Sequence, residues 1–145
     1  MPPYWAGFDE FMFHSYADVR SEEGRAWLRS RSPLYKVDRI CRPLLIGHGA
    51  NDVRCKLQES DQIVRAMRER GLPVTYIVYP DEGHGFARPE NNIAFYGAAE
   101  AFLSAHLGGS YLPLTTAEIE ASTMQIKEGK DGIPGLDPQA RASIP

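Results

Sequence analysis

The stretch that decides the fold is VTYIVYPDEGHGF, residues 74 to 86. Its first six residues are β-branched or aromatic, and a short run of this composition predicts a strand. This strand-like run closes at Pro80. The residues that follow predict a loop, in which Gly83 and Gly85 let the backbone turn sharply and leave the ring of His84 exposed.

A second strand and loop of the same kind begin at Leu44. The run LLI, residues 44 to 46, is short and unbroken, which is typical of a central parallel strand buried on both faces. It is followed by GHGAND, residues 47 to 52, so Asp52 lies in the loop that comes after this strand.

The segments between and around the two strands predict helices. Residues 58 to 70 have a helical apolar stripe, and Gly71 is placed to end it. A last helix is predicted over residues 92 to 107, and Asn91 before it is expected to be solvated. A shorter helix over residues 22 to 30 ends before a proline. The order of strand, helix, strand, loop and helix predicts an α/β fold, with parallel strands joined by crossover helices.

The composition excludes several classes of protein. The 145 residues are 43% hydrophobic and 24% charged, which is typical of a globular chain of one domain or part of one. A net charge of −3, with basic residues dispersed among acidic ones, argues against a nucleic-acid partner. The apolar runs are far shorter than the roughly 20 residues that a membrane span needs. No signal-peptide pattern is present, and the two cysteines suit reduced thiols, so we expect a cytoplasmic protein.

The two loops carry two of the residue types of a serine-hydrolase triad. In such a triad an imidazole takes the proton of the serine hydroxyl, and a buried carboxylate orients the imidazole and stabilises its cation. Because adjacent parallel strands lie about 5 Å apart, the loops at their C-terminal ends share one edge of the sheet. Asp52 and His84 are therefore the candidate acid and base, in the chain order of α/β-hydrolases.

Other interpretations of these residues stay open on spacing alone. His84 is also compatible with a plain turn, and Asp52 with an Asx-turn or a helix N-cap. His48 competes for the role of base, although we favour a structural role because Asp52 needs a partner from another loop. Asp81 and Glu82 are compatible with an alternative dyad or half a metal site. No HxxxH or HxH spacing supports a metal, and no metal or other cofactor is predicted.

Several motifs, in the right order, resemble the catalytic domain of the prolyl oligopeptidase family of serine peptidases. They are PPYW at residues 2 to 5, SPL at 32 to 34, PLLIGHGAND at 43 to 52, ESDQ at 59 to 62 and YPDEGHGF at 79 to 86. The resemblance implies that residues 1 to 109 are the C-terminal part of an α/β-hydrolase domain with an incomplete sheet. It also implies that Asp52 and His84 are the triad acid and base, acting on a peptide or acylated peptide without a cofactor. We expect residues 110 to 145 to form an extended arm.

The sequence departs from the family pattern in two places. The nucleophile elbow, Gly-x-Ser-x-Gly, is not found in these residues, and we expect the chain to be inactive alone because triad members act as a unit. A second hypothesis is therefore a non-catalytic binding or oligomerisation module derived from a hydrolase. The other departure is Cys55, where the family usually has an apolar residue such as valine. We expect the Cys55 side chain to pack behind the loop that carries Asp52, which we call the acid loop.

The incomplete sheet has a consequence for partners. Two strands of the sheet are predicted, and the resemblance implies that earlier strands of the domain pair with the free edge of residues 44 to 46. A bare apolar edge is a template for pairing with another chain. We therefore expect the chain either to be marginally stable or to self-associate through this edge.

Overall fold

The computed structural model describes residues 7, 11 and 16 to 136. The chain divides into two compact units, Met1–Cys41 and Arg42–Pro145. In the first unit, helix α2 spans Glu22–Arg31 and the 3-10 segment η2 spans Pro33–Arg39. Helix α2 begins because the hydroxyl of Ser21 accepts a hydrogen bond from the N–H of Gly24. It ends at Arg31, one residue after the predicted end, because Ser32 precedes a proline.

Residues 1 to 20 are rich in aromatic side chains, and only part of this segment lies within the described residues. The ring centroids of Phe11 and Tyr16 lie 6.3 Å apart in an edge-to-face arrangement. The other aromatic residues of this segment lie outside the described residues; they are Tyr4, Trp5, Phe8 and Phe13.

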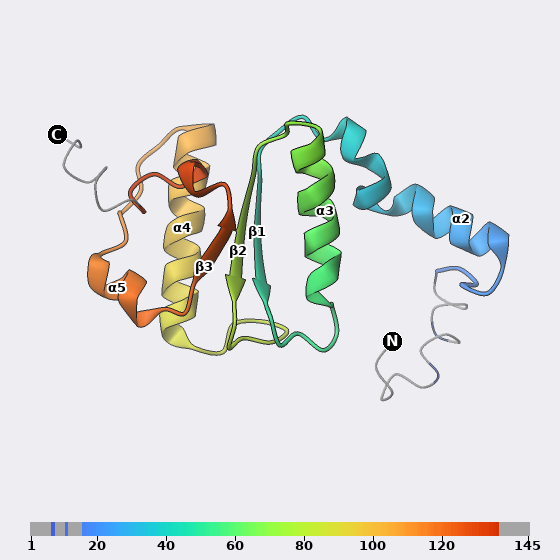
Figure 1. Cartoon of the computed structure of the whole chain (residues 1–145), viewed down its shortest axis with the longest axis horizontal. Helices are drawn as coiled ribbons and strands as arrows, with labels where there is room; N and C mark the ends of the chain where they lie inside the picture. Colours follow the sequence, from blue (N-terminus) through green and yellow to red (C-terminus); the bar gives the residue numbers. More distant parts are fainter. Residues whose placement is uncertain (1–6, 8–10, 12–15, 137–145) are drawn as a thin grey trace. The chain divides into compact units, whose positions relative to one another are not determined.

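The second unit is built on an open sheet of three strands in the order β1-β2-β3 (Figure 1). Strands β1 (Leu44–Gly49) and β2 (Val74–Tyr79) are parallel, and β3 (Gln125–Glu128) pairs antiparallel with β2. Helix α3 (Leu57–Glu69) makes the crossover between the parallel strands. The predicted α/β fold with an incomplete sheet is confirmed.

Helix α3 ends as the sequence predicts. Gly71 has a φ of +68°, a conformation that costs glycine little. Its N–H donates to the carbonyl of Arg68, and the N–H of Leu72 donates to the carbonyl of Met67. These two bonds form a Schellman motif, which fixes the direction in which the chain turns toward β2.

Helix α4 (Pro89–Leu107) begins three residues before the predicted start, and α5 (Thr116–Ala121) follows it. Helices α3 and α4 lie on opposite sides of the sheet (Figure 1). Among the described residues, no helix combines the length and apolar character needed to cross a bilayer.

Strand β2 is the centre of the core, because all six of its residues are buried. Alternate side chains point to opposite faces: the Tyr76 hydroxyl donates to Asp61 on α3, whereas Ile77 packs in one cluster with Ala98 of α4. The first four residues of β1 are only half-buried, so burial on both faces was the wrong expectation for this strand. The reason is that, within residues 16 to 136, β1 pairs with β2 alone.

The residues after position 110 take part in the same core. Ile126 of β3 is in register with Ile77 of β2. The side chains of Leu114, Ile133 and Leu136 are buried in the cluster that contains Ile77. The division of the chain at residue 109 stays a prediction, but the following segment contributes a strand and apolar side chains to the unit.

Candidate active site

The loops that follow β1 and β2 are joined to one another by hydrogen bonds. The N–H of Ala50 donates to the carbonyl of Tyr79 at 2.9 Å, and the N–H of Asn51 donates to that of Glu82 at 2.8 Å. The side-chain amide of Asn51 also donates to the carbonyl of Pro80 at 2.9 Å. The two loops thus form one layer at the C-terminal edge of the parallel strands (Figure 1).

The close approach of these loops depends on Gly49, the last residue of β1. A β-carbon at this position would lie 2.5 Å from the carbonyl oxygen of Glu82 and nearer still to that of Gly83. Of the two glycines beside His84, only Gly85 has a positive φ, at +108°. Gly85 is therefore needed for the turn, whereas Gly49 is needed for the contact between the loops.

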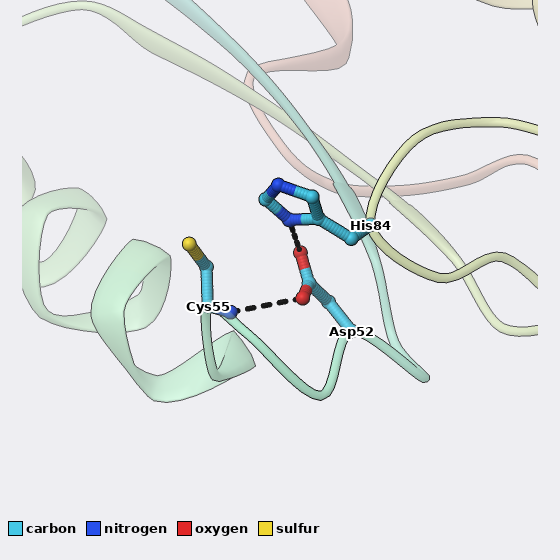
Figure 2. A group of neighbouring side chains, drawn as sticks. All are labelled: Asp52, Cys55 and His84. Atoms are coloured by element: carbon cyan, nitrogen blue, oxygen red, sulfur yellow. Dashed lines mark hydrogen bonds and ion pairs between the residues drawn. The ribbon is translucent and has the colours of Figure 1, made fainter. Parts of the chain in front are cut away.

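Asp52 and His84 meet across the two loops (Figure 2). The Nδ1 atom of His84 lies 2.9 Å from Oδ2 of Asp52, within the expected hydrogen-bond range. The Asp52 side chain is 7% exposed and that of His84 is 47% exposed, so the carboxylate is buried and the ring is accessible. The contact expected from the sequence is present.

The second oxygen of Asp52 holds the acid loop itself. Oδ1 accepts hydrogen bonds from the N–H groups of Arg54, at 2.8 Å, and Cys55, at 2.9 Å. Asp52 is therefore an Asx-turn residue and the partner of His84 at the same time. Because Oδ1 is fixed by the backbone, Oδ2 keeps a defined direction toward the imidazole.

These contacts set the charge of Asp52. Burial, the largest single influence, raises the pKa of the carboxyl group, but the hydrogen bonds from Cys55, His84 and Arg54 together outweigh it. The net result lowers the pKa of Asp52 to about 2. The carboxylate is thus ionised at neutral pH, which is the state that stabilises an imidazolium next to it.

His48 has a structural environment. Its Nδ1 lies 2.7 Å from the Ser60 hydroxyl, and its Nε2 lies 2.9 Å from the carbonyl oxygen of Cys55. Since a carbonyl only accepts, Nε2 must carry the proton, and a neutral ring then accepts from Ser60 at Nδ1. Its Nε2 is 3.9 Å from Oδ2 of Asp52, too far for a hydrogen bond. His48 joins α3 to the acid loop, in line with the structural role that we favoured.

Glu82 stabilises the loop that carries His84, residues 80 to 88, which we call the histidine loop. Its side chain is 1% exposed and accepts hydrogen bonds from the N–H of Ala87 at 2.7 Å, the N–H of Arg88 at 3.0 Å and the amide of Asn91 at 2.8 Å. The Glu82 carboxylate therefore faces the start of α4, and its hydrogen bonds in the described part of the chain go there and not to His84. Asn91 is fully buried, so the expectation that it is solvated was wrong, because its amide pairs with this buried carboxylate.

Asp81 and Asn91 anchor the segment that follows α5. Asp81 accepts hydrogen bonds from the hydroxyl of Thr123 and from Arg88, the latter at 2.6 Å. The side-chain oxygen of Asn91 accepts from the hydroxyl of Ser122 at 2.8 Å and from the N–H of Thr123 at 3.0 Å. The bond from Thr123 is the largest influence that lowers the pKa of Asp81, to about 2. The C-terminal segment is thereby attached to the histidine loop.

Cys55 does not pack behind the acid loop, so that expectation was wrong. It is exposed, and its side chain lies beside those of Asp52 and His84 (Figure 2). The turn made by Asp52 fixes the N–H of Cys55 toward the carboxylate and directs the thiol outward. Partial desolvation, and next the Asp52 carboxylate, raise the pKa of the thiol.

The site opens into a hollow of about 570 Å³. Asp52, Cys55 and His84 line it on the side of the loops, and Phe95 and Tyr96 of α4 contribute aromatic surface. An accessible imidazole beside a mixed polar and apolar hollow suits proton transfer to or from a bound molecule.

The sequence pattern of the prolyl oligopeptidase family matches residues 4 to 110. The chain belongs to this family. It therefore belongs to a family of serine peptidases, as the resemblance of its motifs implied.

Curated relatives agree with this assignment. The chain is 52% identical over 136 residues to dipeptidyl aminopeptidase BIII of Pseudoxanthomonas mexicana, covering 94% of this chain and 20% of the relative. It is 44% identical over 133 residues to dipeptidyl peptidase family member 6 of Caenorhabditis elegans, covering 91% and 18%. It is 29% identical over 91 residues to the acylamino-acid-releasing enzyme of Arabidopsis thaliana, covering 62% and 12%. The chain thus spans at most about a fifth of the length of these relatives.

Sequence reasoning did not find the roles of Glu82, Asn91 and Cys55. The burial of Glu82 and Asn91 depends on the way α4 and the segment after α5 meet the histidine loop, and the local sequence carries no signal of it. For Cys55 a signal was present, because a thiol stands where the family usually has an apolar side chain, and its position three residues after Asp52 places it in the acid loop.

Proposed function

We propose that Asp52 and His84 are the acid and the base of a Ser-Asp-His triad in a serine peptidase. The observation that carries this proposal is the 2.9 Å contact between a buried carboxylate and an exposed imidazole. Family membership supports it, because the two residues stand in the motifs that resemble the acid and base loops of that family.

The geometry supports a definite division of roles. When Nδ1 of His84 donates to Asp52, the neutral ring carries its lone pair at Nε2, on the far side of the ring (Figure 2). Nε2 then accepts the proton of the serine hydroxyl and later gives it to the leaving amine. Asp52 stays ionised throughout and stabilises the imidazolium. The serine itself would come from a Gly-x-Ser-x-Gly elbow, which the printed residues do not contain.

For the substrate, we propose peptides from which a dipeptide is released. One relative is named as a dipeptidyl aminopeptidase and another as a dipeptidyl peptidase family member, and they share 52% and 44% of aligned residues with this chain. The relative named as an acylamino-acid-releasing enzyme shares 29%. The higher identities favour an unblocked peptide over an acylated one.

The test places this chain in a complete enzyme. A chimera replaces the matching residues of the Pseudoxanthomonas mexicana relative with this sequence, and hydrolysis of dipeptidyl nitroanilides is measured. We expect an active chimera in which His84→Ala lowers kcat by about 10⁶-fold, the size of effect known for loss of a triad base. His106→Gln is the matched control, because His106 lies at the far end of α4 and packs on Phe102.

Two outcomes would contradict the proposal. Activity of the His84→Ala chimera close to that of the parent would remove His84 from the chemistry. A chimera that folds, as shown by circular dichroism, but hydrolyses no substrate would instead favour the non-catalytic module.

A further inference from the structure

Asp52, Cys55 and His84 bring three different metal-ligating groups together (Figure 2). One ligand atom from each lies within 4.8 Å of the other two. In a tetrahedral zinc site, bonds of about 2.3 Å to sulfur and about 2.0 Å to nitrogen place ligand atoms about 3.5 Å apart. Cys55 and His84 are exposed, so rotation of their side chains can close the remaining gap. We propose that these three residues form a binding site for a thiophilic divalent cation such as Zn²⁺.

The donor set selects the class of cation. A thiolate sulfur, an imidazole nitrogen and a carboxylate oxygen are ligands of Zn²⁺, whereas Mg²⁺ and Ca²⁺ take oxygen ligands. Three protein ligands leave the fourth tetrahedral position to water. A valine at position 55 would leave only two ligands, so the thiol is what makes the site.

The surroundings hold two of the ligands in place before a cation arrives. Oδ1 of Asp52 accepts from the N–H groups of Arg54 and Cys55, so the carboxylate and the backbone that bears the thiol are fixed relative to one another. The backbone of Cys55 is held a second time, because Nε2 of His48 donates a hydrogen bond to its carbonyl oxygen. Such outer contacts orient ligands and strengthen metal binding.

The spacing of the sequence did not reveal this site for a simple reason. Metal-ligand spacing rules describe ligands that lie on one element or in paired motifs. Here Asp52 and Cys55 come from the loop after β1, and His84 comes from the loop after β2. Only the pairing of the two parallel strands brings the third ligand to the other two.

A bound cation would exclude the use of His84 as a base. Bound at Nδ1, the cation displaces the proton that bridges to Asp52, and this proton moves to Nε2, which can then no longer accept one. Bound at Nε2, the cation takes the lone pair that would receive the serine proton. In either case the thiol proton is released to the buffer as the thiolate binds. The site is thus an inhibitory one for the proposed triad, but cation binding itself does not require that the chain be a peptidase.

The experiment uses the chain itself with Co²⁺ alone and, separately, Zn²⁺ alone. Cobalt bound to a thiolate gives a near-ultraviolet charge-transfer band, and we expect this band to saturate at one cation per chain. The band should be lost in Cys55→Val and kept in Cys41→Ser. Cys41 is the matched control because it is also an exposed free thiol, and it lies in the other unit.

His84→Ala provides an independent measurement with an exposed residue. By calorimetry we expect its affinity for Zn²⁺ to fall at least about tenfold, since even outer-shell changes at metal sites cost that much. Circular dichroism of each variant checks that the fold is retained.

Four results would overturn the proposal: no thiolate band in the parent chain, an unchanged band in Cys55→Val, loss of the band in Cys41→Ser, or an unchanged Zn²⁺ affinity in His84→Ala. None of these results depends on hydrolysis. An inactive peptidase chimera would leave the cobalt band as it is, so failure of the proposed function and failure of the metal site are told apart.

Discussion

Replacing Gly49 with alanine tests whether the contact between the two loops sets the acid and base geometry. The added β-carbon would lie 2.5 Å from the carbonyl oxygen of Glu82, against 3.4 Å or more for ordinary contact. The loops must therefore separate by roughly 1 Å, and overpacking of this kind typically costs about 1 to 3 kcal/mol of folding stability. A shift of that size along the line from Asp52 to His84 would lengthen their 2.9 Å contact beyond hydrogen-bond range.

We expect two measurable effects of Gly49→Ala. In the chimera, kcat/KM should fall by about 100-fold, the usual effect of a misplacement of about 1 Å at a catalytic group. In the isolated chain, the midpoint of urea unfolding should fall. The matched control is Gly83→Ala in the facing loop, because its β-carbon would have its nearest neighbour, the carbonyl oxygen of Asn51, at 3.8 Å.

The reasoning would be refuted by a Gly49→Ala chimera whose kcat/KM stays within a few-fold of the parent while its unfolding midpoint is unchanged. An equal loss in Gly83→Ala would also count against it, since the effect would then not come from the contact between the loops.

Three further predictions concern charge, reactivity and assembly. Because the pKa of Asp52 is about 2 in the fold against an ordinary value of 3.8, its contribution to stability should be present at neutral pH and be lost as the pH falls from about 4 toward 2. Urea unfolding across this range should show a shallower decline for Asp52→Asn than for the parent chain. The isolated chain should neither hydrolyse dipeptidyl nitroanilides nor take a fluorophosphonate label, and a stoichiometric label on any serine would contradict the expected absence of an activated nucleophile. Finally, the half-buried edge of β1 should lead to self-association, visible by sedimentation as a rise in mass with concentration; a monomer at all concentrations would show that this edge is not a pairing surface.

The sequence was sufficient to place the parallel strands and the two candidate site residues. The β-branched run that ends at Tyr79 and the glycines around His48 are local signals, and they depend on few distant contacts. Once two parallel neighbours are predicted, their following loops must share an edge, and the approach of Asp52 and His84 follows from that.

The parts that the sequence did not predict depend on contacts between distant segments. The burial of Asn91 needs both Glu82 and the residues around Thr123, more than thirty positions away. The partial exposure of β1 reflects which strands are present beside it, which its own apolar residues do not reveal. The thiol of Cys55 points outward because of the turn that Asp52 makes. Its direction is set by the backbone of this turn, and the residue type alone does not reveal it.

The attachment of the C-terminal segment means that a chain shortened to residue 109 would lose more than a tail. Strand β3 pairs with one edge of β2, and Ile133 packs in the same cluster as Ile77. Truncation would therefore expose apolar surface that is now buried. Asp81 would also lose the hydrogen bond from the hydroxyl of Thr123. Asp81 lies three residues before His84, in the same loop. Proteolysis between α4 and α5, with loss of the segment beyond it, would therefore disturb the loop that carries His84.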